Sequence, residues 1–286
     1  MKMLLILQQM RPVAIPEYIK DFLALESAPA AIKFIHNHYI KFYRGNPEVS
    51  VVIPAYNEEK NILQTLASLA ANITSRSAEI IVVNNNSTDN TEALVTATGI
   101  TCVTEIKKGI TAARNAGLQI AKGTYILNAD ADAIYPADWI EQMIKPLATN
   151  EKIAITYGRF SFIPVSSTPR TIYFFYEYSA DIIRYINKYF REEAVNVYGF
   201  NSGFRREQGA SVEGFNHPPG SNEDGWLAVK LRDGGFGKLH CVTNTKALVW
   251  TSDRRIEMDG GLMKGIMKRI AKLLLPGKEV VVRADL

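Results

Sequence analysis

The sequence predicts an α/β fold in which helices flank a mainly parallel β-sheet. Short apolar runs alternate with helical stretches from about residue 49 to residue 147, and strands separated by helices form right-handed βαβ units. The runs are apolar throughout instead of alternating with polar residues, as expected of strands that helices cover on both faces. Beyond residue 147 the alternation fades, so we expect a less regular second half.

Each expected element follows from an apolar run or from helical periodicity. We expect strands at 49–54, 79–83, 100–106, 124–129, 153–160 and 245–250. We expect helices at 58–71, 89–97, 110–122, 171–190 and 222–233, and a final helix from about residue 261. Helical patches at 16–27 and 30–43 precede the first strand, and the polar stretch 44–48 ends them.

Composition argues against several classes of protein. With 286 residues and 47% hydrophobic content the chain can bury one large core. A net charge of +4 is too small to indicate a nucleic-acid partner. Cys102 and Cys241 lie far apart without ligand spacing, so we expect a reducing cytoplasm, with neither a disulfide framework nor a zinc site. No signal peptide and no run of about 18 apolar residues is recognisable, so we expect neither secretion by that route nor a membrane span.

Three polar clusters follow predicted strands. They are "PAYNEE" (54–59), "NNNSTDNT" (84–91) and the pair Asp130 and Asp132. Open α/β sheets bind ligands at the carboxyl ends of their strands, so we expect the three clusters to converge at that edge. The amides at 84–86 can offer hydrogen-bond donors and acceptors to a nucleobase.

The aspartate pair directly follows an apolar strand. In extended chain, residues i and i+2 point to the same side, so both carboxylates can face one cation. Mg²⁺ and Mn²⁺ prefer oxygen ligands, and Mg²⁺ commonly binds one or two carboxylates together with substrate phosphates. The alternative is that Asp130 and Asp132 are solvated loop acids or cap the helix that begins near Asp138.

Helix capping is the alternative role for other acidic residues. Asp89 with Glu92, and Ser221 with Asp224, have the spacing of a capping box. The acidic residues after Tyr56 would likewise favour the dipole of a helix that begins there. A carboxylate at a helix start stays ionised at neutral pH, however, and a general base needs the same property, so Asp224 can also serve in catalysis.

Four stretches together resemble family 2 glycosyltransferases with the GT-A fold. They are "VSVVIPAYNEEKNILQTLASL", "IIVVNNNSTDNT", "GITAARNAGLQIAKGTYILNADADAIYP" and "NEDGWLAVKLRDGGFG". The resemblance covers about residues 49–237, and four motifs in the correct order are far more specific than one. It implies a Rossmann-like, mainly parallel sheet flanked by helices, followed by an irregular acceptor-binding C-terminal half.

The resemblance also implies roles for single residues. In such enzymes an Asp-x-Asp site holds the metal and the donor diphosphate, which corresponds to Asp130 and Asp132, with Asp130 also contacting the substrate. A later Glu-Asp pair supplies the catalytic base, which corresponds to Asp224, with Glu223 beside it in the substrate site. Arg114 matches a position near the donor phosphates. The nucleoside pocket corresponds to Pro54, Ala55, Tyr56, Glu58 and Asn85.

Asn85 departs from the family pattern, because many relatives have at this position an aspartate that meets uracil. An amide can accept a hydrogen bond from uracil but can also accommodate other bases, so the base stays open, with a UDP-sugar favoured. Two weaker signals follow in the second half. "NSGFRREQ" (201–208) resembles the floor of the acceptor site, although Arg205 and Arg206 could equally be solvated. "TSDRR" lies where a loop can close over the diphosphate, with Asp253 or Arg254 assisting.

The implied activity is transfer of a hexose from a nucleoside diphosphate to an acceptor hydroxyl, with inversion at the anomeric carbon. The expected cofactor is Mn²⁺ or Mg²⁺. The expected acceptor is a sugar or a lipid-linked molecule, as in cell-surface polysaccharide or glycolipid synthesis. Two other classes stay open: a nucleotidyltransferase, which would release pyrophosphate from a nucleoside triphosphate, and a non-catalytic nucleotide-sugar-binding subunit.

The segment 261–275 has an apolar face and a basic face. The apolar face carries Leu262, Met263, Ile266, Met267, Ile270, Leu273 and Leu274, and the basic face and its edge carry Lys264, Lys268, Arg269 and Lys272. Such a helix can lie in a membrane interface, or it can pack on the protein's own core. The first alternative would place the protein peripherally on the inner face of the cell membrane, where the aromatic helix at 171–190 could help receive a lipid-linked acceptor.

The chain is accordingly divided into four parts. They are an N-terminal helical extension at 1–48, a nucleotide-sugar-binding half at 49–147, an acceptor and catalytic-base half at 148–258, and a C-terminal amphipathic helix with a tail at 259–286.

Overall fold

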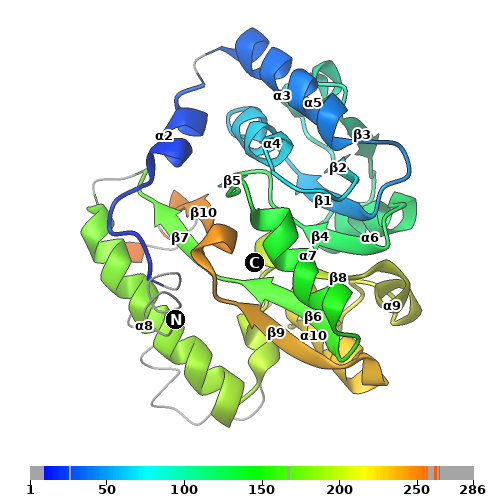
Figure 1. Ribbon diagram of the computed structural model, residues 1–286, viewed down its shortest axis with the longest axis vertical. Helices are drawn as coiled ribbons and strands as arrows, with labels where there is room; N and C mark the ends of the chain where they lie inside the picture. The colour runs from blue at the N-terminus through cyan, green and yellow to red at the C-terminus, as the bar shows by residue number, and fades with distance from the viewer. Residues whose placement is uncertain are drawn as a thin grey trace.

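The computed structural model describes residues 10–25, 27–165, 168–254, 256, 261, 262 and 264. In this part of the chain a seven-stranded sheet has the order β3-β2-β1-β4-β8-β6-β9, and a three-stranded sheet has the order β5-β10-β7. Helices lie on both sides of the larger sheet (Figure 1). The predicted α/β class is confirmed.

The larger sheet is mainly parallel. Its strands are β1 (Val49–Ala55), β2 (Ala78–Asn84), β3 (Thr101–Thr104), β4 (Tyr125–Asn128), β6 (Ile153–Gly158), β8 (Ser202–Arg205) and β9 (Lys238–Val242). The first four run parallel, β6 and β9 are also parallel to each other, and β8 is antiparallel to both β4 and β6. The smaller sheet consists of β5 (Ala133–Ile134), β7 (Phe160–Ile163) and β10 (Val249–Ser252).

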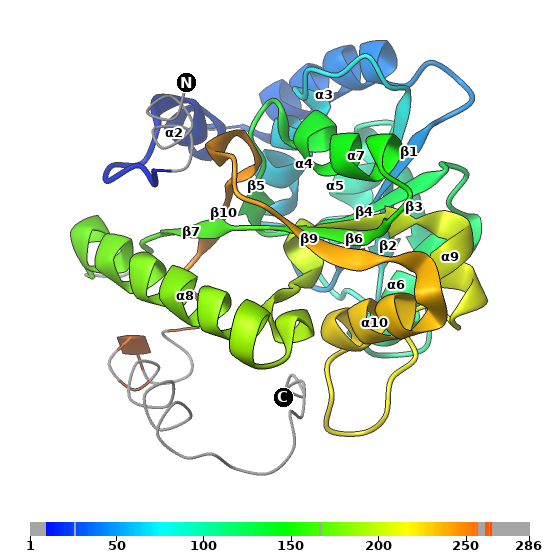
Figure 2. The same ribbon diagram turned by 60° about the horizontal axis from the view of Figure 1, so that its bottom comes forward.

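The helices form a layer on each face of the larger sheet. Figure 2 shows α3, α4, α5 and α7 on one side and α6, α9 and α10 on the other. The α-helices are α2 (Glu17–Leu23), α3 (Ala28–Phe42), α4 (Ile62–Ala70), α5 (Thr91–Ala97), α6 (Ile110–Ile120), α7 (Trp139–Thr149), α8 (Arg170–Phe190), α9 (Arg206–Ser211) and α10 (Glu223–Leu231). Short helical turns occur at Glu193–Asn196, Gly199–Asn201, Arg232–Phe236 and Thr245–Ala247.

The two faces of the central strands bury separate sets of apolar side chains, as the uniformly apolar runs predicted. Val51 and Ile53 of β1 belong to the core beneath α3, α4 and α7. Val52, between them, belongs to the core beneath α6 and α10. Successive side chains of a strand point to opposite faces, so a central strand covered by two helical layers needs apolar residues at every position.

The two N-terminal helical patches are helices, as predicted. Ile35, Tyr39 and Phe42 of α3 are buried in the same core as β1 and α4. Ile19 of α2 is buried with Trp250 against the smaller sheet. The four-part division of the chain stays a prediction.

Four local predictions were wrong. The stretch 153–160 is not one strand, because β6 ends at Gly158 and Phe160 begins β7 of the smaller sheet. The stretch 245–250 is not one strand, because a helical turn at Thr245–Ala247 precedes β10. The helix predicted at 58–71 begins at Ile62, and the residues before it form a turn in which Asn57 has a φ of 54°. The run predicted as a strand at 100–106 forms a strand only at Thr101–Thr104 and is not covered on both faces. This strand, β3, is exposed or half-buried along its length, because it is the edge strand of the sheet.

Most of the predicted C-terminal helix lies outside the described residues. Within them, Leu262 is buried in the main core and Lys264 is exposed. The burial of Leu262 fits the alternative in which this segment packs on the protein. Among the helices of the described ranges, none is both long enough and apolar enough to cross a bilayer.

Candidate active site

The predicted polar clusters meet at the carboxyl edge of the parallel strands. Ala55 at the end of β1 pairs with Asn84 at the end of β2, and the backbone N–H of Asn85 donates to the Ala55 carbonyl at 2.8 Å. Asp130 follows β4, the neighbour of β1 on its other side. The convergence expected from the order of strands and clusters is therefore present.

The loop after β1 is fixed to the loop after β2 by Thr91 and by Asp89, which we had considered as a helix cap. The backbone N–H groups of Glu58 and Glu59 donate to Thr91 Oγ1 and Asp89 Oδ2, at 2.8 and 3.0 Å. Asp89 also accepts from the N–H and hydroxyl of Thr91. The expected capping box of Asp89 with Glu92 is wrong, because Asn90 occupies the N-cap position of α5.

The four nucleoside-pocket residues of this loop differ in exposure. Ala55 is buried, Pro54 and Glu58 are half-buried, and the Tyr56 side chain is 60% exposed at the end of β1. An exposed aromatic ring at the ligand-binding edge of an α/β sheet is available for stacking. The acidic residues that follow do not open a helix, since α4 begins only at Ile62.

Asn85 is used mainly to hold the loop after β3. Both hydrogens of its amide are occupied, because Nδ2 donates to the carbonyls of Glu105 and Lys107 at 2.8 Å each. Its Oδ1 accepts from the backbone N–H of Gly109 at 2.9 Å. A carbonyl oxygen has two lone pairs, so Asn85 can offer a nucleobase one acceptor and no donor.

Arg114 joins three carboxylates from distant parts of the sequence. Its side chain on α6 is 1% exposed, and Nη2 donates to Asp130 Oδ1 at 3.2 Å. Its Nε lies 3.5 Å from Glu223 Oε1 and 3.5 Å from Asp224 Oδ1. Nη1 donates to the carbonyl of Gly199 at 3.3 Å. Arg114 is thus no ordinary helix-surface arginine, and it holds the Asp-x-Asp motif against the Glu-Asp pair.

The electrostatics of this cluster favour a charged guanidinium. Burial alone would lower the pKa of Arg114, but the carboxylates of Asp224, Asp130 and Glu223 outweigh it and raise the pKa above its ordinary value. Arg114 therefore stays cationic and partly neutralises three anions that would otherwise repel one another. Arg114 lies among carboxylates, one of which is Asp130 of the metal motif, and its place near the donor phosphates stays a prediction.

Gly199 is a site residue that sequence reasoning missed. A Cβ atom at this position would lie 2.1 Å from Arg114 Nη2 and 2.3 Å from Asp224 Oδ2. Only a residue without a side chain leaves room for these two groups. No pattern in a single sequence distinguishes this glycine from the others, because the constraint comes from residues far away in the chain.

The alternative in which Asp224 forms a capping box with Ser221 is wrong. Asn222 is the N-cap of α10, and its Oδ1 accepts from the backbone N–H of Gly225 at 2.8 Å. Glu223 and Asp224 occupy the first turn of that helix, and both are buried. A buried carboxylate pair in a helical first turn is favoured by the helix dipole and by the Arg114 charge.

The two aspartates of the Asp-x-Asp motif each contact a different arginine. The backbone of Asp130 is fixed by Tyr135, whose hydroxyl accepts from the Asp130 N–H at 2.9 Å and donates to the Phe200 carbonyl at 3.1 Å. The Asp132 carboxylate accepts from Arg254 Nη2 at 3.1 Å. The side chains of Asp130 and Asp132 are 17% and 11% exposed, so neither is a fully solvated loop acid.

The pair suits a divalent cation that takes further ligands from a substrate. Two half-buried carboxylates on alternate residues supply hard oxygen ligands. No group of three or more His, Cys, Asp or Glu side chains able to hold a metal occurs among the described residues. Such a site fits Mg²⁺ or Mn²⁺, which bind through one or two carboxylates together with substrate phosphates and water.

Arg205 and Arg206 do not reach this edge. Arg205 pairs with Tyr125 at the opposite end of β4 and donates to the carbonyls of Ile153 and Leu147. Arg206 donates to the carbonyl of Gly123. These arginines fix strand ends and loops, so only the first part of "NSGFRREQ", next to Gly199, lies near the candidate site.

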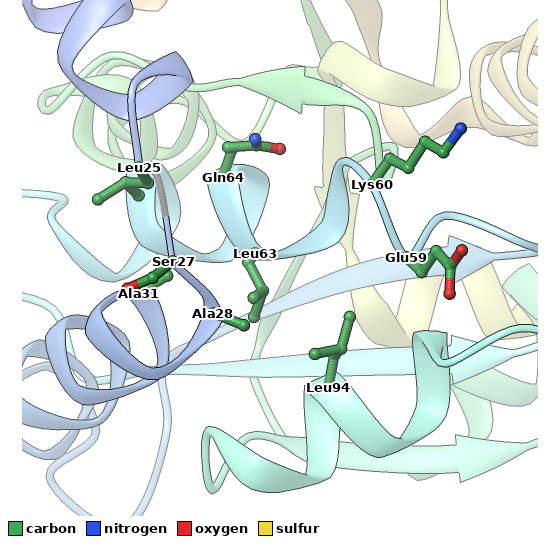
Figure 3. A pocket seen from close by; sticks show the side chains of 9 residues that line it. All are labelled: Leu25, Ser27, Ala28, Ala31, Glu59, Lys60, Leu63, Gln64 and Leu94. Atoms are coloured by element: carbon green, nitrogen blue, oxygen red, sulfur yellow. The ribbon is translucent and has the colours of Figure 1, made fainter.

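A pocket of about 170 Å³ lies elsewhere, between the start of α3 and the helices α4 and α5. Figure 3 shows Glu59, Lys60 and Leu94 at one end of it and Leu25 at the other. None of the predicted site residues lines this pocket. We place the candidate site at the Arg114 cluster, where the titratable groups meet, and not in this pocket.

A family model decides the classification. The model described as glycosyl transferase family 2 matches residues 50–208, more than half of the chain. The chain belongs to glycosyl transferase family 2. The family membership predicted from the four motifs is confirmed, while the fourth motif, with Asp224, lies beyond the matched range.

Curated relatives of this family 2 member include a bacterial glucosyltransferase and a bacterial chondroitin synthase. UDP-Glc:alpha-D-GlcNAc-diphosphoundecaprenol beta-1,3-glucosyltransferase WfgD of Escherichia coli is 33% identical over 119 residues, 40% of this chain and 46% of that protein. Chondroitin synthase of Pasteurella multocida is 32% identical over 116 residues, 39% of this chain and 12% of that protein. The chain thus matches less than half the length of both.

Solved structures share the fold over more of the chain. The mannosyltransferase PcManGT from Pyrobaculum calidifontis, in complex with GDP-Man and Mn²⁺, has a TM-score of 0.54 and 21% identity, covering 89% of this chain and 76% of that one. Glucosyl-3-phosphoglycerate synthase from Mycobacterium tuberculosis, with Mn²⁺, UDP-Glc and phosphoglyceric acid, has a TM-score of 0.51 and 18% identity, covering 86% and 85%. These similarities confirm the GT-A-type fold of the family.

Proposed function

We propose that this family 2 member is a metal-dependent inverting glycosyltransferase that moves a sugar from a nucleoside diphosphate to an acceptor hydroxyl. The observation that carries the proposal is the Arg114 cluster. One buried guanidinium contacts Asp130 of the predicted metal motif and Asp224, the predicted base. A donor diphosphate bound at the first and an acceptor hydroxyl at the second would approach the anomeric carbon from opposite sides, as an in-line displacement requires.

In this proposal Asp224 takes the proton of the acceptor hydroxyl as that oxygen attacks the anomeric carbon. General base catalysis of this kind typically contributes about 10² to 10⁴ in rate. Arg114 orients the Asp224 carboxylate, and Gly199 leaves the space in which the two groups meet. Glu223, on the same side of Arg114, is available to hold the acceptor or donor sugar. Inversion follows because attack occurs in a single displacement.

Asp130 and Asp132 would hold Mn²⁺ or Mg²⁺. When bound, the ion stabilises the negative charge that develops on the departing diphosphate, as a Lewis acid. Glu58 and Tyr56, at the end of β1, would contact the nucleoside. Two of the structural neighbours carry Mn²⁺ with a nucleotide sugar, which supports a divalent cation in this chain without identifying it.

The single acceptor of Asn85 is relevant to the base. A base that carries a ring N–H, such as uracil or guanine, can donate to Asn85 Oδ1, which already accepts from Gly109. We favour a UDP-sugar, since the relative WfgD is named for UDP-Glc. A GDP-sugar, as in the PcManGT complex, is the alternative donor.

For the acceptor we propose a lipid-linked saccharide at a membrane surface, the class named for WfgD. Most of the exposed residues of α8 are apolar or aromatic, and Phe175 and Phe190 are 71% and 76% exposed. Aromatic residues on an amphipathic helix commonly contact the lipid interface.

The basic residues of the segment 261–275 allow a test of membrane contact. Flotation with anionic liposomes should be salt-sensitive and should diminish when Lys264, Lys268, Arg269 and Lys272 are replaced by glutamine. No flotation at low salt would favour a soluble acceptor.

The proposed function is tested by screening nucleotide sugars and nucleoside triphosphates in thermal shift, with Mn²⁺ and with chelator. The expected result is stabilisation by a UDP- or GDP-sugar in Mn²⁺ only, followed by release of the nucleoside diphosphate on incubation. Release of pyrophosphate from a triphosphate would indicate a nucleotidyltransferase. Donor binding without turnover, in the presence of saccharide and lipid-linked acceptors, would indicate a binding subunit.

A further inference from the structure

Arg254 connects two predicted ligand-binding residues that lie far away from it in the sequence. Its Nη2 donates to Glu58 Oε1 at 2.6 Å and to Asp132 Oδ2 at 3.1 Å. Glu58 belongs to the loop after β1, and Asp132 is the second aspartate of the metal motif. One nitrogen of a half-exposed arginine thus bridges the nucleoside side of the site and the metal side.

The backbone beside Arg254 is firmly attached. Asp253 is fully buried, and its carboxylate accepts from the Val165 N–H at 2.9 Å and from the Tyr173 hydroxyl at 2.6 Å. The Asp253 N–H donates to the Ile163 carbonyl at 3.3 Å. The end of β10 is therefore held against β7 and α8, and the Arg254 side chain reaches its two carboxylates from a fixed base.

A guanidinium and a divalent cation cannot use the same carboxylate oxygen independently. Both are cations that approach the lone pairs of Asp132, and two positive charges a few ångströms apart repel each other. A guanidinium is always charged at neutral pH, so the Arg254 side chain brings a full positive charge to Asp132. Metal binding at Asp132 must then either displace Arg254 or work against its charge.

We propose that Arg254 is a built-in competitor for the divalent cation. It holds Asp132 and Glu58 together before the donor arrives, and a metal that binds Asp132 must displace Arg254 or bind against its charge. Arg254 thereby sets the affinity of the site for metal. This inference rests on the proposed role of Asp132 as a metal ligand, and it concerns a residue outside the three predicted motifs that contact the donor.

The test is Mn²⁺ binding, measured as the loss of the free-ion EPR signal, with no donor or acceptor present. Arg254→Gln should bind Mn²⁺ about threefold to tenfold more tightly than the wild type, an effect on the scale of one or two partly exposed ion pairs. Arg254→Lys should stay near the wild type. Raising the salt concentration should shrink the gain of Arg254→Gln, since the competing charge is partly exposed.

Lys246→Gln is the matched control. Lys246 also lies in the segment around β10, but its Nζ pairs with Asp138 at 3.3 Å and its side chain is 56% exposed. The control removes the same unit of charge without touching Asp132 or Glu58, so its Mn²⁺ affinity should equal that of the wild type. Equal gains in both variants would reduce the effect of Arg254 to net charge and overturn the proposal.

Two further outcomes contradict the inference in different ways. Unchanged or weaker Mn²⁺ binding by Arg254→Gln, with clear binding by the wild type that Asp132→Ala abolishes, overturns the competition but leaves the metal site intact. Equal Mn²⁺ binding by the wild type, Arg254→Gln and Asp132→Ala removes the metal role of Asp132, and both the inference and that part of the proposed function fall.

Discussion

Two of the arginine–carboxylate clusters in the described part of the chain are largely buried, and they differ in how completely their carboxylate oxygens are hydrogen-bonded. The first surrounds Arg114 at the carboxyl edge of the larger sheet. The second, which we call the α8 cluster, joins Arg11, Arg159, Arg170 and Arg184 to Glu177 and Asp181 on α8. Both clusters are charged and buried, so charge and burial alone do not separate a candidate site from a structural support.

In the α8 cluster the carboxylates are saturated. Glu177 accepts from the Phe162 N–H at 2.7 Å, from the Ser161 hydroxyl at 2.9 Å and from Arg170 Nη2 at 3.0 Å. Asp181 accepts from both Arg11 Nε and Arg11 Nη2, at 2.8 and 2.9 Å. Such geometry compensates for the desolvation of buried charges, and it attaches the N-terminal segment to β7 and α8.

In the Arg114 cluster some buried atoms lack this compensation. Within the described part of the chain, Arg114 Nε and Glu223 Oε1 make no hydrogen bond, although they lie 3.5 Å apart as an ion pair. Buried polar atoms are normally satisfied, and exceptions call for a functional explanation. Within the described residues, the α8 cluster also holds buried nitrogens without a hydrogen bond, Arg170 Nε and Nη1, but both oxygens of Glu177 accept hydrogen bonds. The open carboxylate oxygen of Glu223 is therefore what makes the Arg114 cluster the better candidate for receiving a polar substrate.

The largest effect should come from Asp224→Asn. Asparagine keeps the shape of the side chain but cannot accept a proton, so turnover of the donor should fall by about 10² to 10⁴ while donor affinity changes little. Helix α10 should be unaffected, because Asn222 is its cap. Release of nucleoside diphosphate and calorimetric donor titration measure the two quantities. Asp233→Asn, at an exposed aspartate beyond the same helix, is the control and should retain wild-type turnover.

Asp181→Asn should have the opposite effect, because it should lower stability and not turnover. Removing this carboxylate charge takes an ion-pair partner from three buried arginines, so the free energy of unfolding should fall by about 2–4 kcal/mol, with turnover per folded molecule retained. Urea denaturation measures the loss. A variant that is as stable as the wild type would show that the α8 cluster does not support the fold.

The loss of unfolding free energy in Asp181→Asn should depend on pH, in a direction set by the pKa of Asp181. Burial alone would raise the pKa of Asp181, but hydrogen bonds and charges from Arg11, with the charges of Arg184 and Arg159, outweigh it and hold the pKa below 3.8. A depressed pKa contributes stability above the unfolded value, and this contribution is lost as the pH falls through the folded value. The difference in unfolding free energy between the wild type and Asp181→Asn should therefore be largest near pH 6 and should decrease below about pH 4.

Gly199→Ala tests the geometry of the Arg114 cluster by adding a Cβ atom to the backbone beside it. The added methyl group would contact Arg114 and Asp224 at distances that force one of them to move. A displacement of about 1 Å can reduce a catalytic rate roughly 10²-fold, so we expect kcat to fall by about tenfold to a hundredfold with a smaller change in KM. Gly234→Ala, where the nearest atom is 3.3 Å away on the Phe236 ring, is the control and should keep its kcat.

Asp132→Ala should have the smallest effect on the fold and a selective effect on the donor. We expect the affinity for a nucleotide sugar in Mn²⁺ to fall roughly tenfold or more, with little change in stability. Calorimetry with Mn²⁺ and with chelator measures both conditions. Equal affinities of variant and wild type in Mn²⁺, together with no effect of chelator on either, would make the metal assignment wrong.

Much of the fold was predictable because its signals are local. The apolar runs gave β1, β2 and β4 to within a residue or two, since a strand covered on both faces has no alternation to obscure it. The turn before α4 was not predictable, because the loop after β1 is shaped by hydrogen bonds to Thr91 and Asp89 from the next loop. Similarly, the backbone partners of Arg205 are set by tertiary packing.

The candidate site was predictable in its members but not in its connections. The spacing of Asp130 and Asp132 and the family motifs identified the carboxylates. No local pattern could indicate that Arg114 lies beneath them, that Gly199 must lack a side chain, or that the amide of Asn85 is already occupied. Each of these facts depends on residues brought together only by the fold.

The contrast between the two clusters is tested most directly by measuring stability and turnover side by side in Asp224→Asn and Asp181→Asn. We expect the two variants to lose different properties. Asp224→Asn loses turnover and keeps its free energy of unfolding, whereas Asp181→Asn loses unfolding free energy and keeps its turnover per folded molecule. If both variants instead lose stability and their turnover merely follows the folded fraction, the Arg114 cluster is a structural support like the α8 cluster, and the proposed base is wrong.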